Sequence, residues 1–331
     1  MILVAICSVA LLVPNVNAGD SNVSRIQFLS NSLGMKRDVH VYVPPDYEQS
    51  KDARYPVVFA LHGLGGNGGD FFSHGRMKEH LDFLIKRELI RPLIVVAPNG
   101  DNGYWTNHFS TKDGMGEKWA DYVSDDLVAE IDRRYRTLAR REGRALVGVS
   151  MGGFGALSIG LGNPEKFHAI ISLSGAIFST PPGCAGGQLS CRPAKNKEPK
   201  CSLTAPTCAG KLGRIAKRSH YRNAWGFPPN LDHWKKINPM ELLAAVVPDD
   251  AFQPRLYLQC GASDKRFHDL FKEASRLLEV NGVTHTARSV KGGRHSWKLW
   301  ESETRRWLRW LEDGWAANKE QGASSKGHQL K

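Results

Sequence analysis

Gly148-Val149-Ser150-Met151-Gly152 connects an apolar segment to a helical pattern and is the most informative motif for the fold class. The apolar residues 144–149 (RALVGV) predict a buried strand, and residues 153–162 (GFGALSIGLG) predict a closely packed helix of small residues. A Gly-x-Ser-x-Gly motif between a strand and a helix indicates a nucleophile elbow, a turn so tight that its flanks must be glycine. The Ser150 hydroxyl would then be exposed beside a helix N-terminus. The alternative interpretation is a glycine-rich turn that contains an ordinary serine.

Apolar runs alternate with helical patterns along most of the 331 residues. Continuous apolar runs are typical of strands that are buried on both faces, and their alternation with helices predicts a mostly parallel sheet covered on both sides. Two alternating segments near the start predict an antiparallel pair that precedes this sheet. The predicted strands are 25–30 and 38–43 for the pair, then 56–61, 93–97, 144–149, 169–173, 255–260 and 285–290. The predicted helices are 70–89, 116–135, 153–162, 266–280 and 296–316.

The two ends of the chain differ from its middle in composition. Residues 1–18 begin with a short apolar run and end in small residues, which predicts an export signal that is cleaved after Ala18. We expect residues 19–316 to form one α/β domain and the polar residues 317–331 to be a disordered tail. No segment after the signal is apolar enough to cross a bilayer, so we expect a secreted or periplasmic protein.

A Cys-, Pro- and Lys-rich interruption at about 178–236 predicts an insert that covers the domain like a lid. Its four cysteines have no Cys-x-x-Cys spacing, which favours two disulfides over a zinc site, with three pairings open. Residues 183–236 contain eleven Lys or Arg residues and two acidic residues, so most of the chain's net charge of +12 lies in this segment. This charge could bind an anionic surface polymer, or it could simply be solvated. The disulfide candidates are Cys184, Cys191, Cys201 and Cys208, whereas Cys260 ends an apolar strand and is predicted to be a buried thiol.

A serine hydroxyl needs a histidine base and an orienting carboxylate to act as a nucleophile. In hydrolases with this elbow the chain order is Ser, then Asp or Glu, then His, and each residue follows a sheet strand. Asp264 follows the strand at 255–260 through a short turn, and His295 follows the last strand through a glycine-containing loop. Their structural alternatives are a helix N-cap for Asp264 and an ordinary structural histidine for His295. The predicted catalytic residues are therefore Ser150, Asp264 and His295.

Two backbone N–H groups should stabilise the oxyanion that forms when Ser150 attacks an ester. One is expected from Met151, at the start of the helix. The other is expected from the glycine-rich loop after residues 56–61, where we choose Leu64, although neighbouring amides could serve. Asn102 and Trp105 follow another strand and are predicted to line the substrate pocket, unless they form a turn with a core tryptophan.

Four motifs in this order resemble the esterase D-type family of α/β-hydrolases, which is similar to S-formylglutathione hydrolases, feruloyl esterases and mycolyltransferases. They are LHGLGGN at 61–67, GVSMGGFGAL at 148–157, CGASD at 260–264 and GGRHSWKLW at 292–300. The resemblance implies an α/β-hydrolase fold, the triad and oxyanion residues chosen above, and no metal or organic cofactor. The basic insert and the predicted export differ from the cytosolic glutathione-thioester branch of the family.

The sequence thus predicts a secreted serine carboxylesterase that forms an acyl-enzyme on Ser150. The expected substrate is a small-molecule or carbohydrate-linked ester, and no nucleic-acid partner is expected. One alternative is an acyltransferase that moves the acyl group to a sugar or lipid alcohol. Another is an inactive binding protein for anionic polymers.

Overall fold

A computed structural model describes most of the chain after residue 18. Residues 1–18, and with them the predicted signal, lie outside the described part. The described residues are 19–109, 117–182, 184, 189–192, 200–203, 219–226, 228–248 and 250–327, and side chains are not described for 189–192, 200–203, 219 and 318–327.

The centre of the molecule is an eight-stranded sheet with the order β1-β2-β4-β3-β5-β6-β9-β10. Strands β1 and β2 pair antiparallel, β2 pairs antiparallel with β4, and the remaining neighbours are parallel, as predicted. The central strands are fully buried because helices cover both faces, which explains their continuous apolar sequences. The strands are β1 (Asn22–Ser30), β2 (Met35–Val43), β3 (Val57–Leu61), β4 (Ile94–Pro98), β5 (Arg144–Val149), β6 (Ala169–Leu173), β9 (Arg255–Gly261) and β10 (Thr286–Val290).

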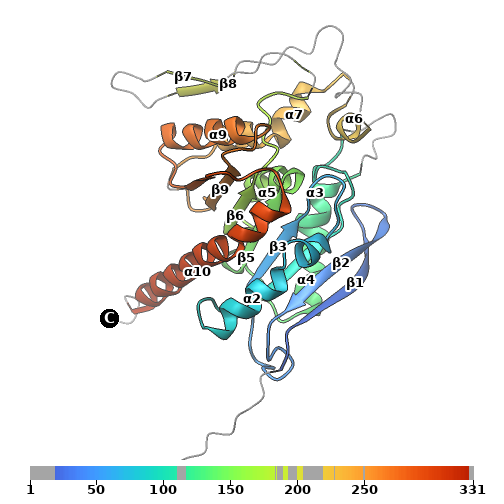
Figure 1. The fold of residues 1–331 in the computed structure, drawn as a ribbon, viewed down its shortest axis with the longest axis vertical. Coiled ribbons are helices and arrows are strands. Elements are labelled where there is room, and N and C mark those ends of the chain that lie inside the picture. Colours follow the sequence, from blue (N-terminus) through green and yellow to red (C-terminus); the bar gives the residue numbers. More distant parts are fainter. Residues whose placement is uncertain are drawn as a thin grey trace, which may run out of the picture.

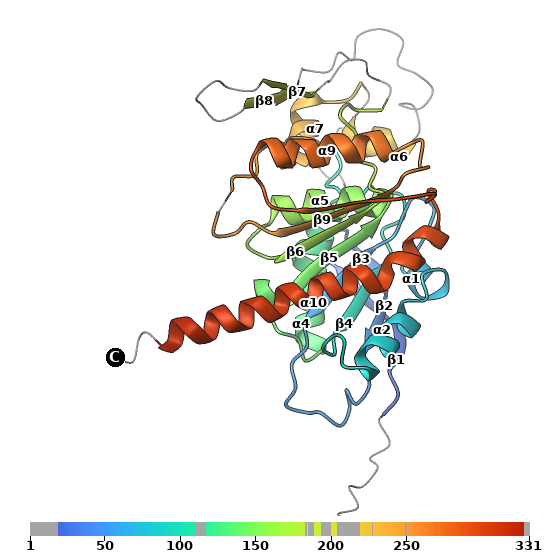
Figure 2. The same ribbon diagram turned by 60° about the vertical axis from the view of Figure 1, so that its left-hand side comes forward.

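The helices form two layers around this sheet (Figure 1, Figure 2). One layer packs on the larger core, which includes buried residues of α4, α5 and α9, and the other layer packs α2 and α10 on the opposite face. The fold is that of an α/β-hydrolase. The helices of the domain are α1 (Asp70–Ser73), α2 (Met77–Lys86), α3 (Trp119–Asp121), α4 (Val128–Arg134), α5 (Met151–Gly162), α8 (Pro239–Ala244), α9 (His268–Val280) and α10 (Trp297–Gly327).

Three predicted helices have different bounds in the structure. The helix predicted at 70–89 is split into α1 and α2, because Arg76 has a positive φ of 45°. The helix predicted at 116–135 contains a π-helical segment at Tyr122–Leu127 between α3 and α4. Helix α10 extends to Gly327, so the tail predicted to be disordered from residue 317 is helical up to that point. Extending an existing helix by further turns has a small free-energy cost, and this segment contains no proline that would end the helix.

The insert is described only in part, so its predicted role as a lid stays a prediction. Its described residues form the hairpin of β7 (Leu189–Arg192) and β8 (Lys200–Leu203) and the helices α6 (Ser219–Trp225) and α7 (Leu231–Ile237). Cys191 and Cys201 are backbone partners in the register of that hairpin. Cys208 lies outside the described residues, so the predicted pairing of four cysteines is untested. Among the described residues, none of the helices has the length and apolar character needed to span a membrane.

Candidate active site

The turn from β5 into α5 has the geometry of a nucleophile elbow. Ser150 has φ 56° and ψ −115°, a backbone conformation that non-glycine residues rarely adopt. A Cβ at Gly148 would overlap the carbonyl oxygen of Gly152, and a Cβ at Gly152 would overlap that of Leu61 on β3. Both flanking positions therefore require glycine, because the start of α5 passes directly over the sheet backbone.

The structure brings Ser150, Asp264 and His295 together from three loops at the carboxyl ends of strands. His295 Nε2 lies 2.9 Å from Ser150 Oγ, and His295 Nδ1 lies 2.7 Å from Asp264 Oδ2. Asp264 Oδ1 accepts backbone N–H groups from Arg266 at 3.2 Å and Phe267 at 3.3 Å. The carboxylate side chain is 1% exposed, so these contacts fix its orientation. This chain of hydrogen bonds is the one that serine hydrolases require.

Aromatic side chains flank the His295 ring and cover part of it, so its side chain is 25% exposed. Phe267 lies 4.9 Å from this ring, and Trp300 lies 5.0 Å from it in an edge-on arrangement. Burial lowers the pKa of His295, and the hydrogen bond that its Nδ1–H donates to Asp264 opposes that change. A lowered pKa keeps the imidazole neutral near pH 7, which is the form that can accept a proton from Ser150.

The backbone amides of the loop after β3 differ in their hydrogen bonding. The N–H of Gly66 donates to Gly63 O at 3.1 Å, and the N–H of Gly65 donates to Asn102 Oδ1 at 2.7 Å. The N–H of Asn67 is also used, by the Asp70 carboxylate. Of the amides at 64–67, the one at Leu64 is thus without a partner among the described residues. The amide of Leu64 is therefore available as an oxyanion donor, and this role stays a prediction.

Asn102 and Trp105 do not line the cleft as predicted. Trp105 is fully buried, and its Nε1 donates to the carbonyl oxygen of His62 at 3.1 Å, so the alternative of a core tryptophan is the correct one. Asn102 instead holds the glycine-rich loop through Gly65. His62 was not predicted as a residue that supports the site. Its Nδ1 donates to Gly63 O at 2.8 Å, and its Nε2 accepts the Gly100 N–H at 2.9 Å. The position of His62 directly after the buried strand β3 is the sequence feature that could have identified it.

A cleft of about 330 Å³ opens above Ser150. The oxyanion loop forms one wall, and residues at the start of α10 form another. Within the described part of the chain, no three His, Cys, Asp or Glu side chains are grouped to hold a metal ion. The side chains that line the cleft beside Ser150 and His295 are Leu64, Asp70, His74, Ser296, Trp297 and Trp300.

Cys260 is a buried free thiol on β9, as predicted. Its Sγ lies 3.8 Å from Asp264 Oδ2, the carboxylate oxygen that also contacts His295 Nδ1. Burial raises the pKa of Cys260 to about 12, and the nearby Asp264 charge adds to this change. The thiolate is therefore suppressed, and Cys260 is not a competing nucleophile.

Comparisons with known proteins agree with this geometry. A family model described as "Putative esterase" matches residues 30–311. The chain is 33% identical over 170 residues to an endo-1,4-beta-xylanase/feruloyl esterase of Xylanibacter ruminicola, covering 50% of this chain and 23% of that protein. It is 23% identical to an acetyl esterase of Caldicellulosiruptor saccharolyticus, over 87% of this chain and 97% of the relative. The first of these matches spans less than a quarter of the relative's length.

Solved structures share the fold. A ferulic acid esterase superposes with a TM-score of 0.68 and 22% identity, over 90% of this chain and 99% of the other. An S-formylglutathione hydrolase from Agrobacterium tumefaciens gives a TM-score of 0.65 and 19% identity, over 90% and 98% of the two chains.

Proposed function

The chain belongs to the esterase family whose model it matches, and from this premise we propose that it is a serine carboxylesterase. Ser150 attacks the ester carbonyl and forms an acyl-enzyme. The observation that best supports this proposal is the linked pair of contacts from His295, at 2.9 Å to Ser150 Oγ and 2.7 Å to Asp264 Oδ2. A buried carboxylate, a neutral imidazole and an exposed hydroxyl in this order can transfer a proton.

Each step of the reaction can be assigned to a group at this site. His295 Nε2 accepts the Ser150 proton as the hydroxyl attacks, and Asp264 stabilises the imidazolium that results. The N–H groups of Leu64 and Met151 hold the tetrahedral oxyanion, an effect worth about 3 kcal/mol for each donor. His295 then protonates the leaving alcohol, and water enters to hydrolyse the acyl-enzyme by the same steps in reverse.

The substrate we propose is an ester that joins a small acyl group to a carbohydrate. The support is that the relatives of this chain are described as feruloyl and acetyl esterases. Trp297 and Asp70 both line the cleft, and a lining with an aromatic face and a polar group suits either a sugar ring or an aromatic acid. Those descriptions name esterases, so hydrolysis is favoured over acyl transfer. The described residues give no support for an anionic polymer partner.

Ser150→Ala tests the nucleophile directly with an aryl acetate and an aryl ferulate as substrates. We expect the variant to lose both activities while its thermal unfolding midpoint stays within a few degrees. Ser263→Ala is the matched control, because Ser263 is exposed in the turn before Asp264. Wild-type turnover by Ser150→Ala would refute the proposal. Added glycerol distinguishes the two reactions, since an acyltransferase would form the glycerol ester in place of the free acid.

We also propose that the protein is exported and cleaved after Ala18. Supporting this, the Gly19 backbone nitrogen lies 2.5 Å from Asp46 Oδ1, and the Asp46 N–H donates to Gly19 O at 3.1 Å. Cleavage would place a charged ammonium group on Gly19, next to that carboxylate. The test is the intact mass of protein recovered outside the cytoplasm, which should correspond to a chain that starts at Gly19. A full-length mass would contradict export by this route.

A further inference from the structure

A groove of about 650 Å³ lies between the edge strand β10 and helix α10. Its volume is in the range of pockets that bind small molecules. Helix α10 connects it to the catalytic cleft, since Trp297 lines the cleft and Arg309 lines the groove. At the helical rise per residue, these two positions are about 18 Å apart along the helix axis. The proposed reaction uses none of the groove's residues.

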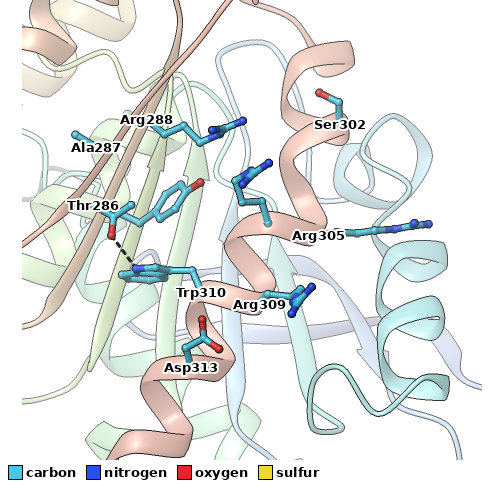
Figure 3. A pocket seen from close by; sticks show the side chains of 10 residues that line it. Thr286, Ala287, Arg288, Ser302, Arg305, Arg309, Trp310 and Asp313 are labelled. Atoms are coloured by element: carbon cyan, nitrogen blue, oxygen red, sulfur yellow. Dashed lines mark hydrogen bonds between the residues drawn. The ribbon is translucent and has the colours of Figure 1, made fainter.

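The groove is strongly cationic. Four guanidinium groups line it, whereas Asp313 is the only carboxylate among the described residues that line it and Glu303 pairs with Arg288, so positive charge is in excess. Figure 3 shows Arg288 on the strand side and Arg309 on the helix side of the groove, whereas Arg305 extends from the helix away from both. The four are Arg288 on β10 and Arg305, Arg306 and Arg309 on α10.

Two of the guanidinium groups are held in place by neighbouring side chains. Arg288 donates through Nε and Nη2 to the two oxygens of Glu303, at 2.5 and 3.0 Å. Arg305 donates through Nε to His80 Nδ1 at 3.0 Å, and its guanidinium carbon lies 3.7 Å from the centre of the Phe83 ring. Because these contacts leave other N–H groups of both arginines unused, the fixed guanidinium groups still offer donors to a ligand.

The other two guanidinium groups have most of their donors free. Arg306 approaches Glu303 only through Nε, at 3.3 Å. Arg309 is exposed, and it has neither a hydrogen bond nor an ion pair within the residues that the structure describes. Both lie on the face of α10 that lines the groove, one helical turn apart. Adjacent guanidinium groups with free Nη atoms suit a bidentate contact with an oxyanion.

A buried hydroxyl in the wall of the groove lacks a partner. Tyr257 is 1% exposed, and its Oη has no hydrogen-bond partner among the described residues. Burial raises the pKa of Tyr257 to about 12, and Glu303 reinforces this change, so the hydroxyl keeps its proton. Beside it, Trp310 Nε1 donates to Thr286 Oγ1 at 2.9 Å, which fixes that part of the wall (Figure 3). Buried donors without a partner are uncommon in proteins, and a ligand would supply the missing acceptor.

We propose that this groove binds a small anion with two or more negative charges, present as phosphate or carboxylate groups. The free guanidinium donors of Arg306 and Arg309 contact one charged group, and the fixed Arg288 contacts another. The Tyr257 hydroxyl donates to the same ligand. Phosphates and carboxylates share this recognition because each presents two oxygens to a guanidinium fork. The site is independent of catalysis at Ser150.

Isothermal titration calorimetry with inorganic pyrophosphate and, separately, with citrate tests this site in the full domain. We expect saturable binding of one anion per chain by at least one probe. Binding of pyrophosphate alone would identify a phosphate ligand, and binding of citrate alone would identify a polycarboxylate. Arg306→Gln with Arg309→Gln should weaken binding more than about tenfold, as expected when two charged hydrogen bonds are lost.

The control is Arg54→Gln with Arg276→Gln, which removes the same charge from exposed positions outside the groove. It should leave the affinity within about twofold, because distant surface charges are screened by salt. Absence of saturable binding by both probes would overturn the proposal, and so would equal weakening by the control pair. Tyr257→Phe should weaken binding about fivefold with no loss of stability. Unchanged affinity in that variant would overturn the role of the Tyr257 hydroxyl.

Discussion

Replacing Asp264 by asparagine should reverse the proton positions on the catalytic histidine. The Oδ1 site accepts two backbone N–H groups, from Arg266 and Phe267. An asparagine must place its carbonyl oxygen there, because its NH₂ group would otherwise face two donors. The NH₂ group then occupies the Oδ2 site and donates to His295 Nδ1. His295 Nε2 must consequently be protonated, and it donates to Ser150 Oγ instead of accepting its proton.

The expected loss follows from this change of tautomer. A triad whose histidine is held in the wrong tautomer loses about 10⁴-fold in kcat, which corresponds to about 5 kcal/mol in the activation barrier. The fold should be unaffected because the side chain has the same shape and keeps its hydrogen bonds. The assay is kcat on an aryl acetate at pH 7, together with the thermal unfolding midpoint.

Asp269→Asn is the matched control for this substitution. Asp269 lies on α9 in an exposed pair with Lys272, at 2.8 Å, and it has no contact with the cleft. We expect the control to keep wild-type activity. If Asp264→Asn is folded and retains more than a tenth of wild-type kcat, the assigned role of this carboxylate is wrong.

Three further predictions follow from the same site. Gly152→Ala should destabilise the protein by more than about 3 kcal/mol in urea unfolding, since its Cβ would overlap the backbone of β3. The control Gly162→Ala should leave stability unchanged, because a Cβ at Gly162 would enter open space. Equal destabilisation by the two variants would contradict the elbow geometry. Asn102→Ala should lower kcat about tenfold without changing the thermal unfolding midpoint, because the Gly65 N–H loses its acceptor and the oxyanion loop becomes more mobile. A change confined to KM would instead indicate that Asn102 contacts the substrate directly. In the pH profile of kcat/KM, the midpoint of the acid limb should lie below pH 6.5, because burial lowers the pKa of His295 and activity is lost only as the pH falls through that pKa. A midpoint above pH 6.5 would contradict the assignment of His295 as the base.

Long apolar runs made much of the sheet predictable. The bounds predicted for β5 and β6 agree with the structure, because a strand buried on both faces has a nearly continuous apolar sequence. Asp264 and His295 could be selected because parallel strands bring their carboxyl ends to one edge, and the structure joins both side chains to Ser150. Topology thus supplied the spatial information that single residues lack.

Other features depend on contacts that no local pattern encodes. Trp105 was expected at the surface of the pocket, but it is buried against Gly155 of α5, and its Nε1 donates to the carbonyl oxygen of His62, just after β3. Asn102 supports a loop that is distant from it in sequence. The cationic groove arises only where β10 and α10 meet, because Arg288 and Arg309 belong to separate elements.

Labelling with a fluorophosphonate probe tests the central proposal most directly. Such a probe reacts with a hydroxyl only when a base activates it, so peptide mapping by mass spectrometry reports the nucleophile itself. We expect one adduct per chain, located on Ser150, that forms at least a hundredfold more slowly in His295→Ala. An adduct on a different residue, or none in protein that still hydrolyses esters, would contradict the proposed mechanism.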